Sequence, residues 1–186
     1  MKSARRAIIT GASSGIGLAT ARRLAKSGWE LLLIGRNEAN LTQLQNELPN
    51  HPNIETVITD LNNHWEIESF LEKYLHREKA VSLLINCAGI GYSRAFEEIS
   101  LKEWNDTFAT NVTAPFLLSQ GILRHWTAME LRGMVIHIGS IFSLMACSGY
   151  APYIASKHAL NGLAKAMAKE LRGKGHEVHI LYPLSF

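Results

Sequence analysis

The stretch "AIITGASSGIGLATARRLAKSG", residues 7–28, decides the fold expected for this chain. It opens with the apolar run "AIIT", which is typical of a short strand buried on both faces. A glycine-rich loop follows, and after it comes a segment with helical spacing that Gly28 ends as a C-terminal stop. A strand, a tight loop and a helix in this order predict the first unit of a parallel α/β sheet.

The same alternation continues along the rest of the chain. Further short runs rich in Val, Ile and Leu begin at Glu30, Ile54, Val81, Met134 and Glu177. Between the runs, helical spacing predicts helices over residues 37–48, 100–131 and 153–172, the first capped by Asn37 and ended before Pro49. The pattern therefore predicts an α/β, Rossmann-like, doubly wound parallel sheet of about six strands with helices on both faces. No linker or repeat divides it, so we expect residues 1–186 to form a single domain.

Composition excludes several classes of protein. The chain is 47% hydrophobic and 19% charged with a net charge of +3, which is ordinary globular usage. The sequence has no cluster of Lys and Arg interleaved with aromatic residues, so nucleic-acid binding is not expected. It also has no run that approaches the roughly 18 apolar residues of a membrane span. The opening apolar run is too short for a signal peptide. Cys87 and Cys147 are too few for a disulfide framework, so we expect a cytoplasmic protein.

The glycine-rich loop has the spacing Gly11-x-x-x-Gly15-x-Gly17 at the end of the first strand. Glycines let the backbone turn sharply and approach a diphosphate, while the N–H groups and the dipole of the following helix favour an anion. A tight turn without a ligand is the alternative, but the strand–loop–helix context favours dinucleotide binding. We expect the loop to bind the cofactor through Gly11, Ser13, Ser14, Gly15, Ile16 and Gly17.

The residue after the second strand bears on the choice of cofactor. Dinucleotide folds often carry an acid there for the ribose 2′-hydroxyl, whereas Gly35 fills that position here and Arg36 follows. Arg pairs bidentately with phosphate, so NADP(H) is favoured, with NAD(H) as the alternative cofactor. Arg36 could instead be a solvated residue at the start of a helix. Further cofactor contacts are expected at later strand ends, from Asp60, Leu61, Asn86, Ala88 and Gly89, although Asp60 could also cap a helix.

Tyr153 and Lys157 lie four residues apart in "YIASK", which places both on one face of the predicted helix. Tyrosine is a poor acid–base group at neutral pH because its ordinary pKa is about 10. A nearby ammonium and the positive end of the helix lower that pKa, so we expect Tyr153 to transfer protons near neutral pH.

Two polar residues accompany this pair. Ser140 ends the fifth predicted strand, where its hydroxyl can hydrogen-bond a substrate carbonyl or alcohol oxygen. Asn111 lies mid-helix, where Asn is a poor helix former, and it can hold a water next to Lys157. Among the other chemically capable residues, His137 is expected to be packed within a strand and Cys87 to be a small buried residue. The histidines lack metal-ligand spacing, so no metal is expected.

The motifs "TGASSGIG", "NCAG", "TNV", "IGS" and "YIASK" occur in the order seen in the short-chain dehydrogenase/reductases, and the chain resembles that family from about Ala4 to Pro183. The resemblance implies a catalytic tetrad in which Ser140 positions the substrate oxygen and Tyr153 exchanges the proton. Lys157 would bind the nicotinamide ribose and tune Tyr153, and Asn111 would hold a relay water. A hydride would pass between nicotinamide and a small carbonyl or secondary alcohol substrate.

The resemblance also implies an assembly and further cofactor contacts. Family members pair across a two-fold axis through the helices that here carry Asn111 and Lys157, so a homo-oligomer, most simply a dimer, is expected. Cofactor contacts are implied for Tyr153, Lys157 and Pro183.

The sequence departs from the family pattern at two places. Cys87 stands in "NCAG", where Asn is commoner. Family members usually continue past the sixth strand with a glycine after the proline, a substrate-covering loop and helix, and a seventh strand. The printed sequence stops at Phe186, so we expect these parts to be missing and the sixth strand to form an exposed edge. The alternative function is therefore a non-enzymatic relative that binds nucleotide or a protein partner without turnover.

Overall fold

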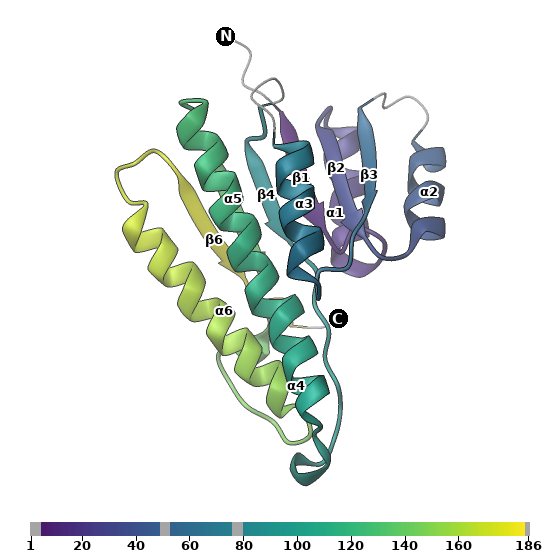
Figure 1. Ribbon diagram of the computed structural model, residues 1–186, viewed down its shortest axis with the longest axis vertical. Coiled ribbons are helices and arrows are strands. Elements are labelled where there is room, and N and C mark those ends of the chain that lie inside the picture. The colour runs from purple at the N-terminus through teal and green to yellow at the C-terminus, as the bar shows by residue number, and fades with distance from the viewer. Residues whose placement is uncertain (1–4, 49–52, 76–79, 185–186) are drawn as a thin grey trace.

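The short apolar runs form one six-stranded parallel sheet in the computed structural model, which describes residues 5–48, 53–75 and 80–184 (Figure 1). The strand order is β3-β2-β1-β4-β5-β6, and neighbouring strands pair in parallel throughout. β6 lies at one edge of the described sheet, as predicted. The strands are β1 (Arg6–Thr10), β2 (Glu30–Gly35), β3 (Ile54–Ile58), β4 (Leu83–Asn86), β5 (Met134–Ile138) and β6 (Glu177–Leu181).

Helices connect these strands, mostly where the sequence predicts them. Asn37 caps α2 by accepting a hydrogen bond from the backbone N–H of Asn40 at 3.0 Å, and Gly28 ends α1 with a φ of +77°. Pro49, the predicted stop for α2, lies outside the described residues. The α-helices are α1 (Gly15–Lys26), α2 (Glu38–Glu47), α3 (His64–Tyr74), α4 (Leu101–Phe108), α5 (Ala114–Ala128) and α6 (Ala151–Glu170); short 3₁₀ turns cover Phe96–Glu98 and Ile141–Ser143.

The long helix predicted over residues 100–131 is divided by a π-helical turn, η2 (Ala109–Thr113). Pro115 at the start of α5 explains the change, because it has no N–H to give the carbonyl of Asn111 its ordinary α-helical hydrogen bond. The wider turn displaces the backbone where Asn111 lies and leaves the helix otherwise continuous.

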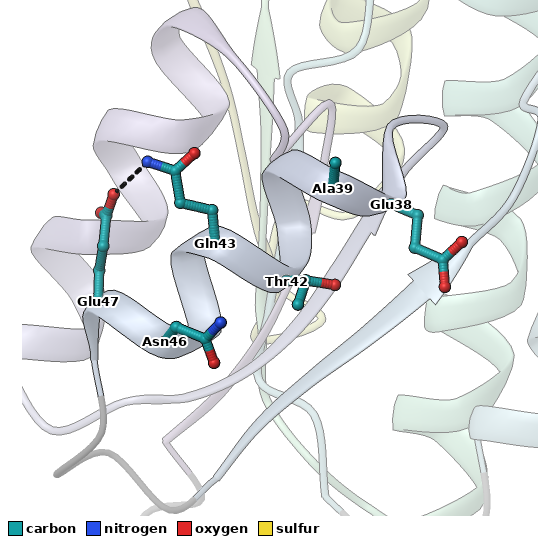
Figure 2. A pocket seen from close by; sticks show the side chains of 6 residues that line it. All are labelled: Glu38, Ala39, Thr42, Gln43, Asn46 and Glu47. Carbon is teal, nitrogen blue, oxygen red and sulfur yellow. Dashed lines mark hydrogen bonds between the residues drawn. The ribbon is translucent and has the colours of Figure 1, made fainter.

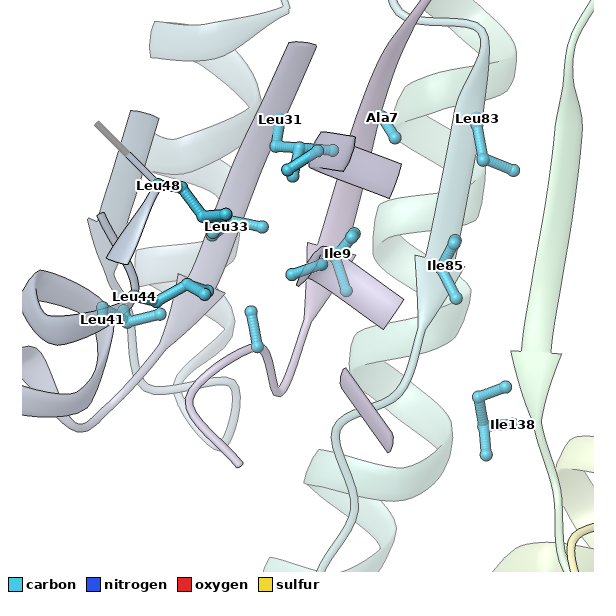
Figure 3. Packing of buried hydrophobic residues seen from close by; sticks show 13 residues of the cluster. Ala7, Ile9, Leu31, Leu33, Leu41, Leu44, Leu48, Leu83, Ile85 and Ile138 are labelled. Atoms are coloured by element: carbon cyan, nitrogen blue, oxygen red, sulfur yellow. The ribbon is translucent and has the colours of Figure 1, made fainter. Parts of the chain in front are cut away.

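Two apolar layers bury the two faces of the sheet. Alternate strand residues such as Ile9 and Leu33 pack under α1 and α2, in the layer shown in Figure 3. Their sequence neighbours, such as Ile8 and Leu32, face the layer formed by α3, α5 and α6. Burial on both faces is the reason that the central strands β1, β2 and β4 are mostly apolar, whereas the edge strand β6 alternates between exposed and partly buried residues.

The strand order positions the site. β1 lies at the centre, and the chain leaves it toward β2 on one side and reaches β4 on the other. In an open parallel sheet, the loops at the carboxyl ends of two such strands diverge and leave a crevice. Ligands are expected there.

Candidate active site

A cleft of about 1090 Å³ opens at the carboxyl ends of the strands. It brings together most of the predicted site residues, from the glycine loop at Gly11 to Pro183 after β6. Asn86 and Asn111 are the exceptions, because both lie buried behind the lining. The predicted residues in the lining are Gly11, Ser13, Ser14, Gly15, Ile16, Gly17, Arg36, Asp60, Leu61, Ala88, Gly89, Ser140, Tyr153, Lys157 and Pro183.

The glycine loop has the shape that a diphosphate requires. A Cβ on Gly17 would lie 2.3 Å from the carbonyl oxygen of Gly11, so the loop and the first helical turn are in direct backbone contact. Gly15 has a φ of +51°, and a Cβ there would have open space around it. The Ser14 side chain makes no capping hydrogen bond, so it does not occupy the first N–H groups of α1. These features fit a dinucleotide phosphate.

Thr10, at the end of β1, contacts the loop after β4 on the side of the crevice opposite the glycine loop. Its role was not predicted from the sequence. Its hydroxyl oxygen accepts hydrogen bonds from the backbone N–H groups of Cys87 and Ala88, both at 3.0 Å. Its place at a buried strand end next to the glycine loop is the signal that could have identified it. The contact fixes the loop after β4 against β1.

The end of the cleft near β2 and β3 is closely packed around Gly35. A Cβ on Gly35 would lie 3.2 Å from the hydroxyl of Ser13 and 3.4 Å from Leu41. Arg36 is exposed and lines the cleft just before α2, and Asn40 donates to the carbonyl of Ser13 at 3.0 Å. Ser13 and Arg36 thus lie where a ribose 2′-substituent is expected.

Asp60 does not cap α3, the alternative considered from the sequence. Its carboxylate accepts from the backbone N–H of Asn62 at 3.1 Å, and the helix is capped by Asn63. Asp60 and Leu61 both line the cleft beyond β3.

Asn86 forms part of a buried polar layer under the cleft. Its amide nitrogen lies 3.3 Å from Nδ1 of His137 on the neighbouring strand, and His137 is fully buried. Burial lowers the pKa of His137 to about 4, so the imidazole is neutral at physiological pH. Burial also raises the pKa of Cys87 to about 12, and a thiol that keeps its proton is a poor nucleophile. His137 is packed in its strand as expected, whereas Cys87 is only partly buried and lines the cleft.

Asn111 is anchored by three hydrogen bonds. Its amide nitrogen donates to the carbonyl of Ile90 at 2.8 Å and to the hydroxyl of Ser156 at 2.9 Å, while its oxygen accepts from the N–H of Ile90 at 2.8 Å. Ser156 in turn donates to the carbonyl of Tyr153 at 2.7 Å. The π-turn, the loop after β4 and the start of α6 are therefore linked through one side chain.

Ser140 and Tyr153 meet in the cleft through a side-chain hydrogen bond. Burial raises the pKa of Tyr153 above its ordinary value, and the bond with Ser140 opposes this only in part. The lowering predicted from the sequence is not found, because desolvation of the phenol outweighs the hydrogen bond with Ser140. The Nζ atom of Lys157 lies 5.5 Å from the centre of the Tyr153 ring.

Lys157 is 4% exposed, and its ammonium donates to the carbonyl of Ile138 at 2.8 Å. Burial lowers the pKa of Lys157 to about 8. A Cβ on Gly89 would lie 3.5 Å from both this Nζ and the side-chain oxygen of Asn111, so the turn after β4 passes directly between the two groups. Both distances are ordinary van der Waals contacts, so the turn packs against the two groups without crowding them.

A second hollow follows the outer side of α2 and does not have the character of a site (Figure 2). All of its lining comes from one helix and is exposed, and the contact within it is a hydrogen bond of 2.9 Å from Gln43 to Glu47. Its lining residues are Glu38, Ala39, Thr42, Gln43, Asn46 and Glu47.

The described part of the chain lacks two further features. Within residues 5–48, 53–75 and 80–184, no three His, Cys, Asp or Glu side chains gather as a metal ion would need. None of the helices described there is both long and apolar enough to cross a membrane.

Comparisons with known proteins agree with this geometry. A family model described as short chain dehydrogenase matches residues 5–185. Gluconate 5-dehydrogenase from Gluconobacter oxydans is 35% identical over 97% of this chain and 71% of its own length. The 3-oxoacyl-[acyl-carrier-protein] reductase FabG from Escherichia coli is 33% identical over 95% of this chain and 71% of its own length.

Solved structures show the same similarity. A metagenomic short-chain oxidoreductase in complex with NADP has a TM-score of 0.91 at 31% identity, covering 99% of this chain and 84% of that chain. A 4-hydroxyisoleucine dehydrogenase complexed with NADH has a TM-score of 0.87 at 28% identity, covering 96% of this chain and 74% of that chain. The similar structures thus include both an NADP complex and an NADH complex.

Proposed function

This chain belongs to the short-chain dehydrogenase family, a family of oxidoreductases, and on that premise we propose that it is an NADP(H)-dependent carbonyl reductase. Residues 1–186 would act as one dinucleotide-binding and catalytic domain. The observation that carries the proposal is the hydrogen bond between Ser140 and Tyr153 in a cleft that begins at the glycine loop. A substrate oxygen could contact both of these hydroxyl groups next to the expected cofactor site.

The raised pKa of Tyr153 favours reduction of a carbonyl over oxidation of an alcohol. A phenol that keeps its proton at neutral pH is suited to donate it to the oxygen of a ketone or aldehyde. Ser140 accepts a hydrogen bond from the backbone N–H of Phe142 at 3.2 Å, and its hydroxyl, which meets Tyr153 in this structure, can turn to donate to the same substrate oxygen. When bound, a nicotinamide coenzyme supplies the hydride to the carbonyl carbon. The hydride and the proton from Tyr153 together convert the carbonyl to an alcohol.

We assign Asn111 a positioning role through its side chain and a water-holding role through its backbone. The side chain is engaged by Ile90 and Ser156. Pro115 leaves the main-chain carbonyl of Asn111 without its α-helical donor, so that carbonyl is the group able to accept a water. Such a water would return a proton to the Lys157 side of the site after Tyr153 has given one up.

The preference for NADP(H) is supported by the crowding at Gly35 and by the charge of Arg36. No acid is present at position 35 to bind a ribose 2′-hydroxyl, and a Cβ there would already lie 3.2 Å from the Ser13 hydroxyl and 3.4 Å from Leu41. A 2′-phosphate would instead meet the hydroxyl of Ser13 and the guanidinium of Arg36, which can pair with it bidentately.

We also propose a cytoplasmic homodimer formed through the α4–α5 and α6 helices that carry Asn111 and Lys157. Large apolar side chains are exposed along this region, among them Phe96, Leu101, Trp104 and Phe116. A patch of this kind supports burial against a second chain. Cys87 and Cys147 are free thiols, which supports a reducing compartment.

The experiment that tests the function is NADPH oxidation with a panel of ketones and aldehydes, compared between the wild type and Tyr153→Phe. Removing the phenolic hydroxyl should lower turnover roughly 100- to 10,000-fold while NADPH still binds. Tyr74→Phe on α3 is the matched control, because Tyr74 lies outside the cleft lining. Unchanged turnover in Tyr153→Phe would overturn the proposal. NADPH binding without turnover of any carbonyl would favour the non-enzymatic alternative.

A further inference from the structure

The part of the cleft around Ser140 and Tyr153 is lined by aromatic side chains in mutual contact. The ring of Phe142 meets Tyr153 edge-on, with centroids 6.3 Å apart and planes at 86°. On its other side Phe142 is stacked with Tyr150, at 6.3 Å and 16°. Tyr150 is 38% exposed, so this aromatic strip, residues Phe142, Tyr150 and Tyr153, runs from the reacting phenol to the mouth of the cleft.

Branched apolar side chains extend the same surface. Ile90 and Ile141 line the cleft from the loops after β4 and β5, and Leu184 lines it after β6. Leu184 is 83% exposed, so it offers apolar area to whatever occupies the mouth. A bound apolar group would take this area and the aromatic strip out of water together.

The charged side chains of the described lining are placed elsewhere. They are Arg36, Asp60 and Lys157. Arg36 follows β2, while Ser140 follows β5, three strand positions away, which at the usual spacing is roughly 14 Å. Lys157 already donates to the carbonyl of Ile138 at the strand end. A carboxylate or phosphate on the substrate would therefore lose water beside Phe142 without gaining a cation.

We propose that this cleft takes an uncharged ketone or aldehyde whose aromatic or branched apolar group packs against Phe142 and Tyr150. The inference rests on the proposed function, because it names the substrate class of the same site. The proposed substrate differs from the sugar acid in the name of one relative, gluconate 5-dehydrogenase, because gluconate is a carboxylate. An aromatic group fits the strip because its face can stack on Phe142 while its carbonyl reaches Ser140 and Tyr153.

The test compares methyl ketones that differ in one group. Benzylacetone carries a phenyl ring, levulinate carries a carboxylate, and butanone carries neither. With NADPH in excess, we expect kcat/KM to be at least about tenfold higher for benzylacetone than for levulinate. A kcat/KM for levulinate or ketogluconate equal to or above that for benzylacetone would overturn the inference.

Two variants assign the preference to the strip. Phe142→Ala and Tyr150→Ala should each lower kcat/KM for benzylacetone about tenfold more than for butanone. Tyr150→Ala is the cleaner variant, because Phe142 also contacts Tyr153. Leu144→Ala is the control: Leu144 lies in the same loop, is 56% exposed and is outside the cleft lining. If kcat/KM fell equally for both ketones in both variants, the aromatic strip would not determine substrate preference.

Binding measured apart from turnover separates failure of this inference from failure of the proposed function. Saturation-transfer NMR on the chain loaded with NADP⁺ should give transfer to the phenyl protons of benzylacetone and less to levulinate. If benzylacetone binds and no ketone is reduced, the reductase proposal fails and the inference stands. If the phenyl protons receive no transfer, the inference fails, whether or not some other carbonyl is reduced.

Discussion

The ammonium of Lys157 donates a hydrogen bond to the main-chain carbonyl of Ile138, at 2.8 Å. The contact joins the first turns of α6 to the last residue of β5, directly before Gly139 and Ser140. It brings a cation to the lining of the cleft at a position that is 4% exposed. This contact keeps Lys157 beside Tyr153, but the ammonium loses most of its hydration there, which destabilises its charged form.

The first prediction is that Lys157 lowers the stability of the protein at neutral pH. Its pKa falls from the ordinary 10.5 to about 8 on burial, so between these values the unfolded chain binds more protons than the folded one. Stability should therefore rise by about 1.4 kcal/mol per pH unit from pH 8 toward 10.5. Lys157→Met should raise the free energy of unfolding at pH 7 by roughly 2 to 3 kcal/mol and abolish this rise.

Urea unfolding at several pH values measures both effects. Lys165→Met is the matched control, since Lys165 is exposed on the same helix. The same pH slope in the wild type and in Lys157→Met would show that Lys157 is not the titrating group.

The second prediction concerns cofactor choice at Arg36. If its guanidinium pairs with the 2′-phosphate, Arg36→Ala should weaken NADPH binding about 10- to 100-fold and leave NADH binding nearly unchanged. Titration calorimetry with both coenzymes measures the ratio. Arg23→Ala on the exposed side of α1 is the control, because Arg23 lies outside the cleft lining. An equal loss for both coenzymes would remove the basis of the NADP(H) preference.

The sequence was sufficient to predict the sheet, because each strand is a short run rich in Ile, Leu and Val between helical segments or loops. It did not reveal α3, where Ile67 and Phe70 are the buried positions in an otherwise polar segment. The π-turn was also missed, although Pro115 was visible. A proline inside a helix can end it, kink it or widen one turn, and tertiary packing around Asn111 determines which occurs.

At the site, the sequence placed Ser140 and Tyr153 in one cleft correctly, because strand ends and helix starts fix their positions. It gave the wrong direction for the pKa of Tyr153, since the extent of burial is not visible in "YIASK". It also missed Thr10 and Ser156, whose hydroxyls make structural contacts rather than lining the cleft.

The third prediction concerns stability in acid. The pKa of His137 falls from 6.5 to about 4 on burial, so the unfolded chain is protonated first as the pH drops. The contribution of the neutral imidazole is complete above pH 6.5 and is lost between 6.5 and 4, at about 1.4 kcal/mol per pH unit. His137→Asn should reduce the slope of the free energy of unfolding against pH in this range by the equivalent of about one proton. His158→Asn should leave the slope unchanged, because His158 is exposed. Equal slopes in the two variants would contradict the assignment.

The fourth prediction tests the proposed dimer. Phe116 is 44% exposed at the start of α5, so Phe116→Glu places a charge in the expected interface. Sedimentation should show the wild type as a dimer and the variant shifted toward monomer. Ile58→Glu is the control, because Ile58 is 49% exposed on β3 at the far edge of the sheet. A monomeric wild type, or equal dissociation in both variants, would count against the proposed interface.

The fifth prediction is that two Gly→Ala substitutions change stability in opposite directions. A Cβ on Gly133 would lie 2.2 Å from the ring of Trp126, which is fully buried and donates to the carbonyl of Val81 at 2.6 Å. The ring cannot retreat without losing that bond, so Gly133→Ala should destabilise the fold by about 1 to 3 kcal/mol. Gly162 lies in α6 with open space around a new Cβ, so Gly162→Ala should stabilise it by about 1 kcal/mol. A denaturation midpoint that does not fall in Gly133→Ala would contradict the Trp126 contact, and one that falls in Gly162→Ala would contradict the open space at that position.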